Sequence, residues 1–405
     1  MMRETDMAKT RVTKSDNDTF SGKLIDDFNN TNIATFLDRW GPEEVIQVYD
    51  PEINMQGILI IDNTILGPGN GGIQISPLAT PQKIFQLART RTWTCALSNV
   101  PFGGAKAGIK ADPFVINKIQ YIKSFANKIS HTVPYKYIAT TDFNVGQYEI
   151  EEFVNIVGDS NGATGKPENM GGIPCELGTA GFGVGLAIDV SYNLLKNYLN
   201  LPKQFSDATV AIRGFENVGS GIAKYLYNKG SKIVAISDQW GGIYNQNGIS
   251  IENVLKYSNV SSEKSSLKNY KPAKIITDKD ILKIDCDIFI SASGKNFLTE
   301  KTISHLKAKF FVEEINDPVT PVIEQLLNKK GVIVLPNILT DIGSVICSNA
   351  EYNRISVETA FTRMESKVKE ITELVVQRSL ETNSPIRRVA EEIAQEKILN
   401  ARRQT

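Results

Sequence analysis

The chain has 405 residues, of which 41% are hydrophobic and 22% charged, a composition typical of a globular protein with two domains. Its 45 lysines and arginines are balanced by 45 aspartates and glutamates, so the formal net charge is zero. This balance removes the electrostatic attraction that nucleic acids and anionic membranes exert on basic proteins, and we expect neither as a partner.

Cysteine and histidine are both scarce. The cysteines are far apart in the sequence and form no Cys-x-x-Cys pair, which predicts free thiols in a reducing, cytoplasmic compartment and no structural zinc. With only two histidines, we expect no metal site. The N-terminus lacks the apolar segment of a signal peptide, the apolar runs are too short to span a membrane, and residues 1–19 are predicted to be disordered.

The first part of the chain mixes strands and helices. Apolar runs at 45–50 and 57–63 predict strands, and a helix is predicted from Pro81 with Thr80 as its N-cap. Two further helices are expected within 112–130 and 145–158. A stretch rich in Gly, Pro and Asn follows at 158–178 and is typical of a domain boundary. We therefore expect an α/β domain over residues 20–180.

From about residue 181 the pattern becomes an alternation of helices and short apolar strands. Alternation of this kind predicts a Rossmann-like, doubly wound parallel sheet, here over 181–364. The tail is helical and amphipathic, and we expect 365–405 to pack back on the first domain and complete it. The predicted strands are "ATVAIRGF", "SKIVAISD", "DCDIFISAS", "KFFVEEI" and "GVIVLP".

The stretch "VAIRGFENVGSG" has the context of a dinucleotide-binding turn with one position changed. The Gly-x-Gly-x-x-Gly pattern has Gly214 and Gly219, but its middle glycine is Glu216. A strand runs into Gly214 and a helix opens near Asn217, so unpaired N–H groups would face a pyrophosphate. If the Glu216 side chain turns outward, a cofactor still binds; if not, this is a Rossmann-like domain with a decayed cofactor site.

Asp238 ends the next predicted strand, 24 residues after Gly214. A carboxylate there accepts hydrogen bonds from a ribose 2′-OH and disfavours a 2′-phosphate, which favours NAD over NADP. The expected cofactor contacts therefore run over Gly214, Phe215, Glu216, Asn217, Val218 and Gly219, with Asp238 beside them.

A lysine, Lys106, lies among small residues in "NVPFGGAKAGIKADP". A lysine enclosed by close-packed backbone suits general-base or carbonyl-polarising chemistry. Spacing alone favours a surface-loop lysine beside flexible glycines.

This string closely resembles the catalytic-lysine motif of the glutamate/leucine/phenylalanine/valine dehydrogenase family, and the resemblance, closest to archaeal-type glutamate dehydrogenases, extends over about 35–400. "TTDFNVGQ" resembles the segment that carries a catalytic aspartate, here Asp142. "CELGTAGFGV" resembles the approach to the cofactor domain, which implies Thr179 as a cofactor contact. "EEINDPVTP" places Asn316 near the nicotinamide, and "LPNILTDIGSVICS" leads to a substrate-contacting Ser348.

Three departures from the family pattern fall on ligand-holding positions. Asn70 stands where glutamate-specific members have a lysine that pairs with the substrate side chain, and Gln74 where they usually have arginine. Thr94 stands where the lysine that grips the α-carboxylate is expected. With Ser348, Asn70 and Thr94 make up the implied substrate-binding set. Arg89 and Arg91, on the same predicted helix as Thr94, are candidates to replace its cation.

The resemblance leaves two hypotheses open. The first is NAD(P)-dependent oxidative deamination of a glutamate-like L-amino acid to a 2-oxoacid and ammonium, with Lys106 and Asp142 as the catalytic pair. The second is a weak or inactive paralogue that acts as a regulatory or structural subunit. The family implies a homo-oligomer, typically a hexamer, and the second hypothesis adds a hetero-oligomer with an active homologue.

Overall fold

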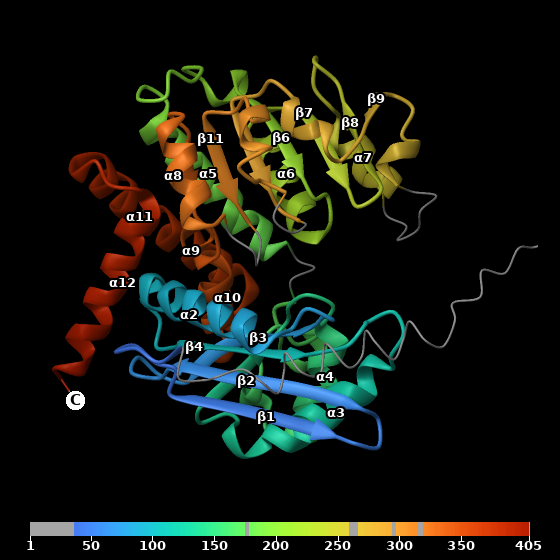
Figure 1. Cartoon of the computed structure of the whole chain (residues 1–405), viewed down its shortest axis with the longest axis vertical. Coiled ribbons are helices and arrows are strands. Elements are labelled where there is room, and N and C mark those ends of the chain that lie inside the picture. The colour runs from blue at the N-terminus through green and yellow to red at the C-terminus, as the bar shows by residue number, and fades with distance from the viewer. Residues whose placement is uncertain (1–35, 175–177, 259–265, 294–296, 315–318, 405) are drawn as a thin grey trace, which may run out of the picture.

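The computed structural model describes residues 36–174, 178–258, 266–293, 297–314 and 319–404. Residues 1–19 and Asn316, for which the sequence made predictions, lie outside these ranges. Two β-sheets stand one above the other, with helices α9 (Asn337–Thr340) and α10 (Ile342–Tyr352) between them (Figure 1).

The first sheet has the strand order β1-β2-β4-β3-β5. β2 runs antiparallel to β1 and β4, whereas β3 is parallel to both of its neighbours. Helix α2 covers one face of this sheet, and α3 and α4 pack through the apolar cluster on the other face. The elements are β1 (Glu44–Asp50), β2 (Met55–Asn63), β3 (Gly69–Ile75), α2 (Pro81–Ser98), β4 (Gly103–Ile109), α3 (Lys118–Ile129), β5 (Tyr137–Thr140) and α4 (Gln147–Val157).

Helix α2 confirms the predicted start. Pro81 occupies the first turn, and the Thr80 hydroxyl accepts a hydrogen bond from the Lys83 N–H at 3.3 Å. The helix lies directly on β4, because a Cβ at Gly104 would come within 2.2 Å of the Thr92 backbone nitrogen. Glycine at 104 therefore brings the polar face of α2 close to the middle of the sheet.

Three strands of this sheet, β3, β4 and β5, were not predicted. β3 and β4 run through "GNGGIQI" and "GGAKAGI", where glycines erase the alternation that marks a strand. Their burial explains the composition, because every residue of both strands is buried and neighbouring backbones approach too closely for larger side chains. Lys106 is thus on a central strand, and its alternative interpretation as a surface-loop residue is wrong.

The second sheet has the strand order β12-β11-β10-β6-β7-β8-β9. The five predicted strands are all present and mutually parallel, which confirms the doubly wound fold. Two short antiparallel strands, β8 and β9, extend one edge and were not predicted. The strands are β6 (Thr209–Arg213), β7 (Lys232–Asp238), β8 (Gly241–Tyr244), β9 (Lys274–Ile276), β10 (Ile288–Ser291), β11 (Phe310–Glu313) and β12 (Ile333–Leu335).

Helices connect and cover the two sheets. α5 and α6 pack against the β6 side chains of one face, and α8 packs on the opposite face. α12 returns to the first part of the chain, where the Lys397 ammonium donates to the Leu97 carbonyl at 2.9 Å, which confirms the predicted packing of the tail (Figure 1). These helices are α5 (Thr179–Leu195), α6 (Asn217–Asn228), α7 (Ile251–Ser258), α8 (Pro321–Lys329), α11 (Val357–Thr382) and α12 (Ile386–Arg402).

The domain limits that we proposed fall inside helices, with residue 180 in α5 and residue 364 in α11. They stay proposals. No helix in the described part of the chain is both long and apolar enough to cross a bilayer. Three of the cysteines, Cys95, Cys286 and Cys347, are thiols outside any disulfide, as predicted, and all three are buried.

Candidate active site

The first sheet holds a buried ion pair between Lys106 and Asp142. Lys106 is on β4 and only 8% exposed, and its ammonium contacts the carboxylate of Asp142, which follows β5. β3 lies between these two strands, so Lys106 has to reach across it. The crossing point is Gly72, where an added Cβ would lie 2.6 Å from the Asp142 Cβ. The glycines thus allow two charged groups from different strands to meet inside the protein.

Arg91 reaches the same region from α2. Its Nη2 donates to the Asn70 side-chain oxygen at 2.5 Å, and its Nη1 donates to the Asp341 carboxylate at 2.8 Å. Asn70 itself is on β3 and fully buried. The Nε–H of Arg91 is buried and has no hydrogen-bond partner within the described residues, an arrangement that costs free energy unless a ligand accepts that hydrogen.

Thr94, the α2 residue that was predicted to bind substrate, does not offer a group to a ligand. The Thr94 hydroxyl is buried and donates to the Thr90 carbonyl at 3.0 Å. Arg89 is engaged elsewhere, with Nη1 on Asp38 at 2.6 Å and Nε on Asp62 at 2.8 Å. Of the two arginines that were candidates to replace the missing cation, Arg91 alone contacts a predicted substrate residue.

Helix α10 and the end of β11 add acidic groups that the sequence analysis missed. Asp341, just before α10, contacts Arg91 and accepts from the Ser344 hydroxyl. Ser348 lies one turn after Ser344 and is buried. Glu314 accepts from the Thr340 hydroxyl at 2.7 Å, and burial together with repulsion from Asp341 raises its pKa to about 8. Glu314 lies in the motif "EEINDPVTP" and Asp341 in "LPNILTDIGSVICS". No spacing rule distinguished these two acids from surface carboxylates.

The glycine turn of the second sheet has the geometry that its context predicted. Gly214 has φ +100°, and a Cβ at Gly219 would overlap the Gly214 carbonyl oxygen at 1.7 Å. Helix α6 begins at Asn217 with Glu216 as its N-cap residue, so its first N–H groups face the turn. Phe215 is buried and Val218 is partly buried against the core.

Glu216 is exposed, although neighbouring protein atoms partly desolvate its carboxyl group. This partial desolvation and the repulsion from Asp238 raise the pKa of Glu216, whereas a hydrogen bond with Ser293 and the charge of Arg213 act in the opposite direction. Glu216 therefore takes up a proton at a higher pH than an ordinary glutamate.

Asp238 ends β7, as predicted, but its carboxylate is already occupied. Its Oδ1 accepts from the N–H groups of Trp240 at 2.8 Å and Gly241 at 3.0 Å. Its Oδ2 accepts from the Leu267 N–H at 2.8 Å and the Ser266 hydroxyl at 3.0 Å. Thr179, the remaining described candidate, is the first residue of α5 and is buried.

Comparison with known proteins agrees with this geometry. Residues 171–405 match the family described as Glutamate/Leucine/Phenylalanine/Valine dehydrogenase, and residues 42–157 match the Glu/Leu/Phe/Val dehydrogenase dimerisation domain. The chain belongs to the Glu/Leu/Phe/Val dehydrogenase family. Its membership makes it an amino-acid dehydrogenase that uses NAD(P), and the alternative of an inactive paralogue is not favoured. The match to the dimerisation domain supports self-association.

Individual relatives are named as glutamate dehydrogenases. That of Aeropyrum pernix is 33% identical over 331 residues, which cover 78% of this chain and 77% of the relative. The NADP-specific enzyme of Saccharolobus shibatae is 31% identical over 303 residues, 72% of this chain and 69% of the relative. Among solved structures, hetero-hexameric glutamate dehydrogenase of Thermus thermophilus in a leucine-bound form has a TM-score of 0.78, with 21% identity and 98% coverage of both chains.

Proposed function

We propose that Lys106 and Asp142 carry the oxidative deamination of a glutamate-type L-amino acid to its 2-oxoacid and ammonium. The observation that supports this role is their direct contact inside the first sheet, where Lys106 is buried and Gly72 lies against Asp142. The bound nicotinamide supplies the acceptor for the hydride that leaves the substrate Cα. The Lys106 ammonium then polarises the oxygen that water adds to the iminium carbon, and Asp142 moves protons to and from the substrate nitrogen.

The direct test is amino-acid-dependent reduction of NAD+ and NADP+ by the purified protein. We expect turnover with both 2-oxoacid and ammonium as products in equal amounts. A folded protein that binds cofactor but reduces neither with any amino acid would contradict the proposal.

Arg91 is proposed to bind the substrate α-carboxylate in place of the missing lysine at position 94. Its guanidinium is oriented by Asn70 and Asp341, and its unpartnered Nε–H needs an acceptor. A carboxylate is the acceptor that guanidinium groups bind best. The changes at positions 70 and 94 are then one compensated arrangement, in which an arginine one turn away on α2 replaces a lysine.

Replacing Arg91 by glutamine should lower kcat/KM by about ten- to a hundredfold, because a charge-assisted hydrogen bond is worth roughly 1.5–3 kcal/mol. Steady-state kinetics should show the loss mainly in KM. Adding Thr94→Lys to this variant should recover part of it. Arg89→Gln serves as the comparison, since it breaks the contacts with Asp38 and Asp62 and should lower the melting temperature without raising KM. Equal KM effects for both arginines would contradict the assignment.

The substrate side chain is proposed to end in an oxygen atom. Asn70 is fully buried and presents an amide where an apolar wall would suit leucine. Its oxygen accepts from Arg91, and one of its two N–H groups donates to the Ile138 carbonyl at 3.4 Å. An aliphatic substrate would give the second N–H group no acceptor, which is costly. We therefore expect glutamate or glutamine to be deaminated more efficiently than leucine in a substrate panel, and preference for leucine would show that Asn70 does not face the substrate.

We infer that the chain assembles as a homo-hexamer, as the family does. The Thermus thermophilus neighbour is described as hetero-hexameric, so a mixed assembly with a second homologue is the other arrangement to examine. Sedimentation of the purified chain distinguishes them: a hexamer of one chain supports the first, and a smaller species that enlarges only on addition of a homologue supports the second.

The raised pKa of Glu216 predicts a pH dependence of cofactor binding. Below that pKa the carboxyl is neutral, and above it a negative charge lies beside the expected pyrophosphate site, so affinity should fall as pH rises through it. At a pH above that pKa, Glu216→Gln should bind NAD+ roughly five- to thirtyfold more tightly than the wild type, for a screened repulsion of about 1–2 kcal/mol, and should flatten the pH profile. Calorimetric titration would measure both. Glu252→Gln, an exposed change on α7, should alter neither.

A further inference from the structure

The carboxylate that the sequence assigned to ribose recognition is a structural group. Asp238 receives four hydrogen bonds from its own chain, which use the lone-pair positions that a carboxylate offers. They join the turn after β7 to the segment at Ser266 and Leu267. A ribose hydroxyl would have to displace one of these donors.

A second carboxylate, Asp278, lies next to the same strand end. Its Oδ1 accepts from the Ser237 hydroxyl at 3.1 Å, and its Oδ2 accepts from Arg213 Nη2 at 2.7 Å and Nε at 3.2 Å. Ser237 directly precedes Asp238, and its carbonyl accepts from the Gly214 N–H at 2.9 Å. Ser237 therefore links Asp278 to the glycine turn through two hydrogen bonds, one from its hydroxyl and one to its carbonyl.

Asp278 is held firmly and remains accessible. Arg213, which orients it, is itself fixed by a contact with the Ser293 carbonyl and by stacking over the Phe297 ring at 4.4 Å. The Asp278 side chain is 33% exposed, and its Oδ1 accepts only one of the hydrogen bonds described here. A positioned carboxylate with a free lone pair is the acceptor that a sugar hydroxyl requires.

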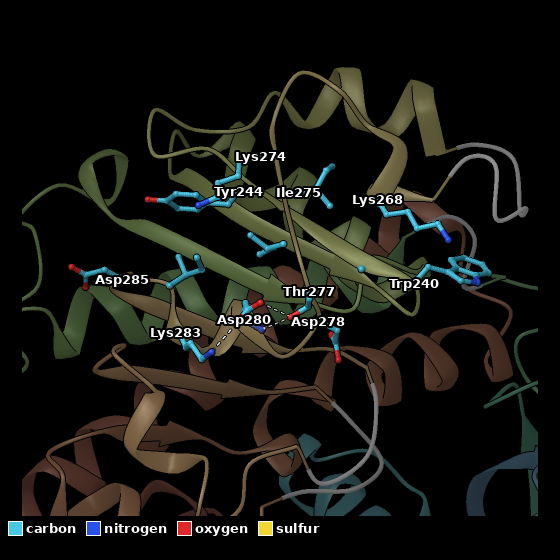
Figure 2. A pocket seen from close by; sticks show the side chains of 13 residues that line it. Trp240, Tyr244, Lys268, Lys274, Ile275, Thr277, Asp278, Asp280, Lys283 and Asp285 are labelled. Atoms are coloured by element: carbon cyan, nitrogen blue, oxygen red, sulfur yellow. Dashed lines mark hydrogen bonds and ion pairs between the residues drawn. The ribbon is translucent and has the colours of Figure 1, made fainter.

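The position of Asp278 in the fold is that of a cofactor contact. Arg213 ends β6 and pairs in register with Ser237 on β7 and Ser291 on β10. The strand order reverses between β6 and β10, because the chain passes from β6 to β7 on one side and later fills β10, β11 and β12 on the other. In such sheets ligands bind beyond the carboxyl ends of the strands at this point. Asp278 also lines a groove of about 700 Å³ (Figure 2). Trp240 and Lys268 lie toward the same end of the groove, whereas Tyr244 and Asp285 lie at the other (Figure 2).

We propose that Asp278 accepts the hydrogen bond of the adenosine ribose 2′-OH and thereby selects NAD(H) over NADP(H). This inference rests on the proposed function, since it concerns the cofactor of the same reaction. A 2′-phosphate carries a charge of about −1.5 to −2 and would approach the Asp278 carboxylate, with Arg213 already paired to it. The crevice therefore repels the 2′-phosphate and offers the 2′-hydroxyl an acceptor.

The test is calorimetric titration of the full-length protein with NAD+ and with NADP+. We expect the wild type to bind NAD+ more tightly, and Asp278→Asn to lower the ratio of NAD+ to NADP+ affinity by at least about tenfold. Asp278→Ser is a second variant that keeps the Arg213 contacts with Ser293 and Phe297. Asp238→Asn is the matched control, which should lower the melting temperature and leave the ratio within about twofold.

The outcomes separate this inference from the proposed function. A wild type that binds and reduces cofactor, with an unchanged ratio in both Asp278 variants, would overturn the role of Asp278 alone. A ratio that moves in Asp238→Asn instead would return the role to Asp238. A folded wild type that binds neither nucleotide would overturn both proposals.

Discussion

Replacement of Lys106 by methionine should lower amino-acid turnover by about a hundred- to ten-thousandfold while NAD(P) still binds. The expected loss is the usual contribution of a positioned acid–base group. Methionine fills nearly the same volume, so the pocket is not emptied. Rates measured under saturating substrate, together with cofactor titration, would show whether the loss is confined to the chemical step.

Two further variants make the Lys106 result interpretable. Lys106→Met leaves the Asp142 carboxylate buried beside an apolar side chain, so part of the loss could reflect instability. Adding Asp142→Asn removes that charge and should restore the melting temperature without restoring turnover. Lys123→Met, in an exposed pair with Glu152, is the surface control and should retain full activity. Retained turnover in Lys106→Met would end the assignment of this residue as catalytic.

Replacement of Arg387 by methionine should destabilise the fold by about 3–5 kcal/mol at neutral pH. Arg387 on α12 contacts Glu313 of β11 at 2.6 Å and Glu324 of α8 at 2.5 Å. The three side chains are 19%, 0% and 9% exposed, respectively. Removal of the guanidinium leaves two buried carboxylates without their cation, which is far more costly than the loss of a surface pair.

The destabilisation should depend on pH. Burial already raises the pKa of Glu313, and the Arg387 charge opposes that shift. Without Arg387 the folded-state pKa rises further above the unfolded value, so the deficit grows as pH rises through this range and shrinks in mild acid. Denaturant unfolding at several pH values would measure it. Arg388→Met is the matched control, because that side chain is 70% exposed and pairs only with Glu392. Equal losses in both variants would contradict a buried cluster.

The Arg387 cluster is also connected to the proposed substrate site. α12 contacts α2 through Lys397 and the second sheet through Arg387, so one helix joins both parts of the molecule. Glu313 directly precedes Glu314, whose neighbour Asp341 contacts Arg91. Loss of Arg387 should therefore raise KM as well as lower stability.

The sequence by itself determined the two-domain α/β fold and the start of α2, and its motifs made Lys106 and Asp142 candidates for the catalytic pair. These features depend on local signals: apolar runs, an N-cap followed by proline, and motifs whose residues are close together in the chain. Lys106, on β4, was singled out by the resemblance of its whole motif to the family and not by the small residues around it alone. The strand conformation of β3 and β4 was missed because glycine leaves no alternation to detect.

Only the tertiary structure decided which charged groups meet. Arg91 bonds with Asn70, 21 residues away, and with Asp341, 250 residues away. Asp238 is saturated by donors that include Leu267, and Asp278, 65 residues from Arg213, becomes the accessible carboxylate. Such pairings depend on how strands and helices pack in space, and a difference of one turn on α2 separates Arg91 from Thr94. Hydrogen bonds form over about 3 Å, a precision that residue spacing along the chain does not contain.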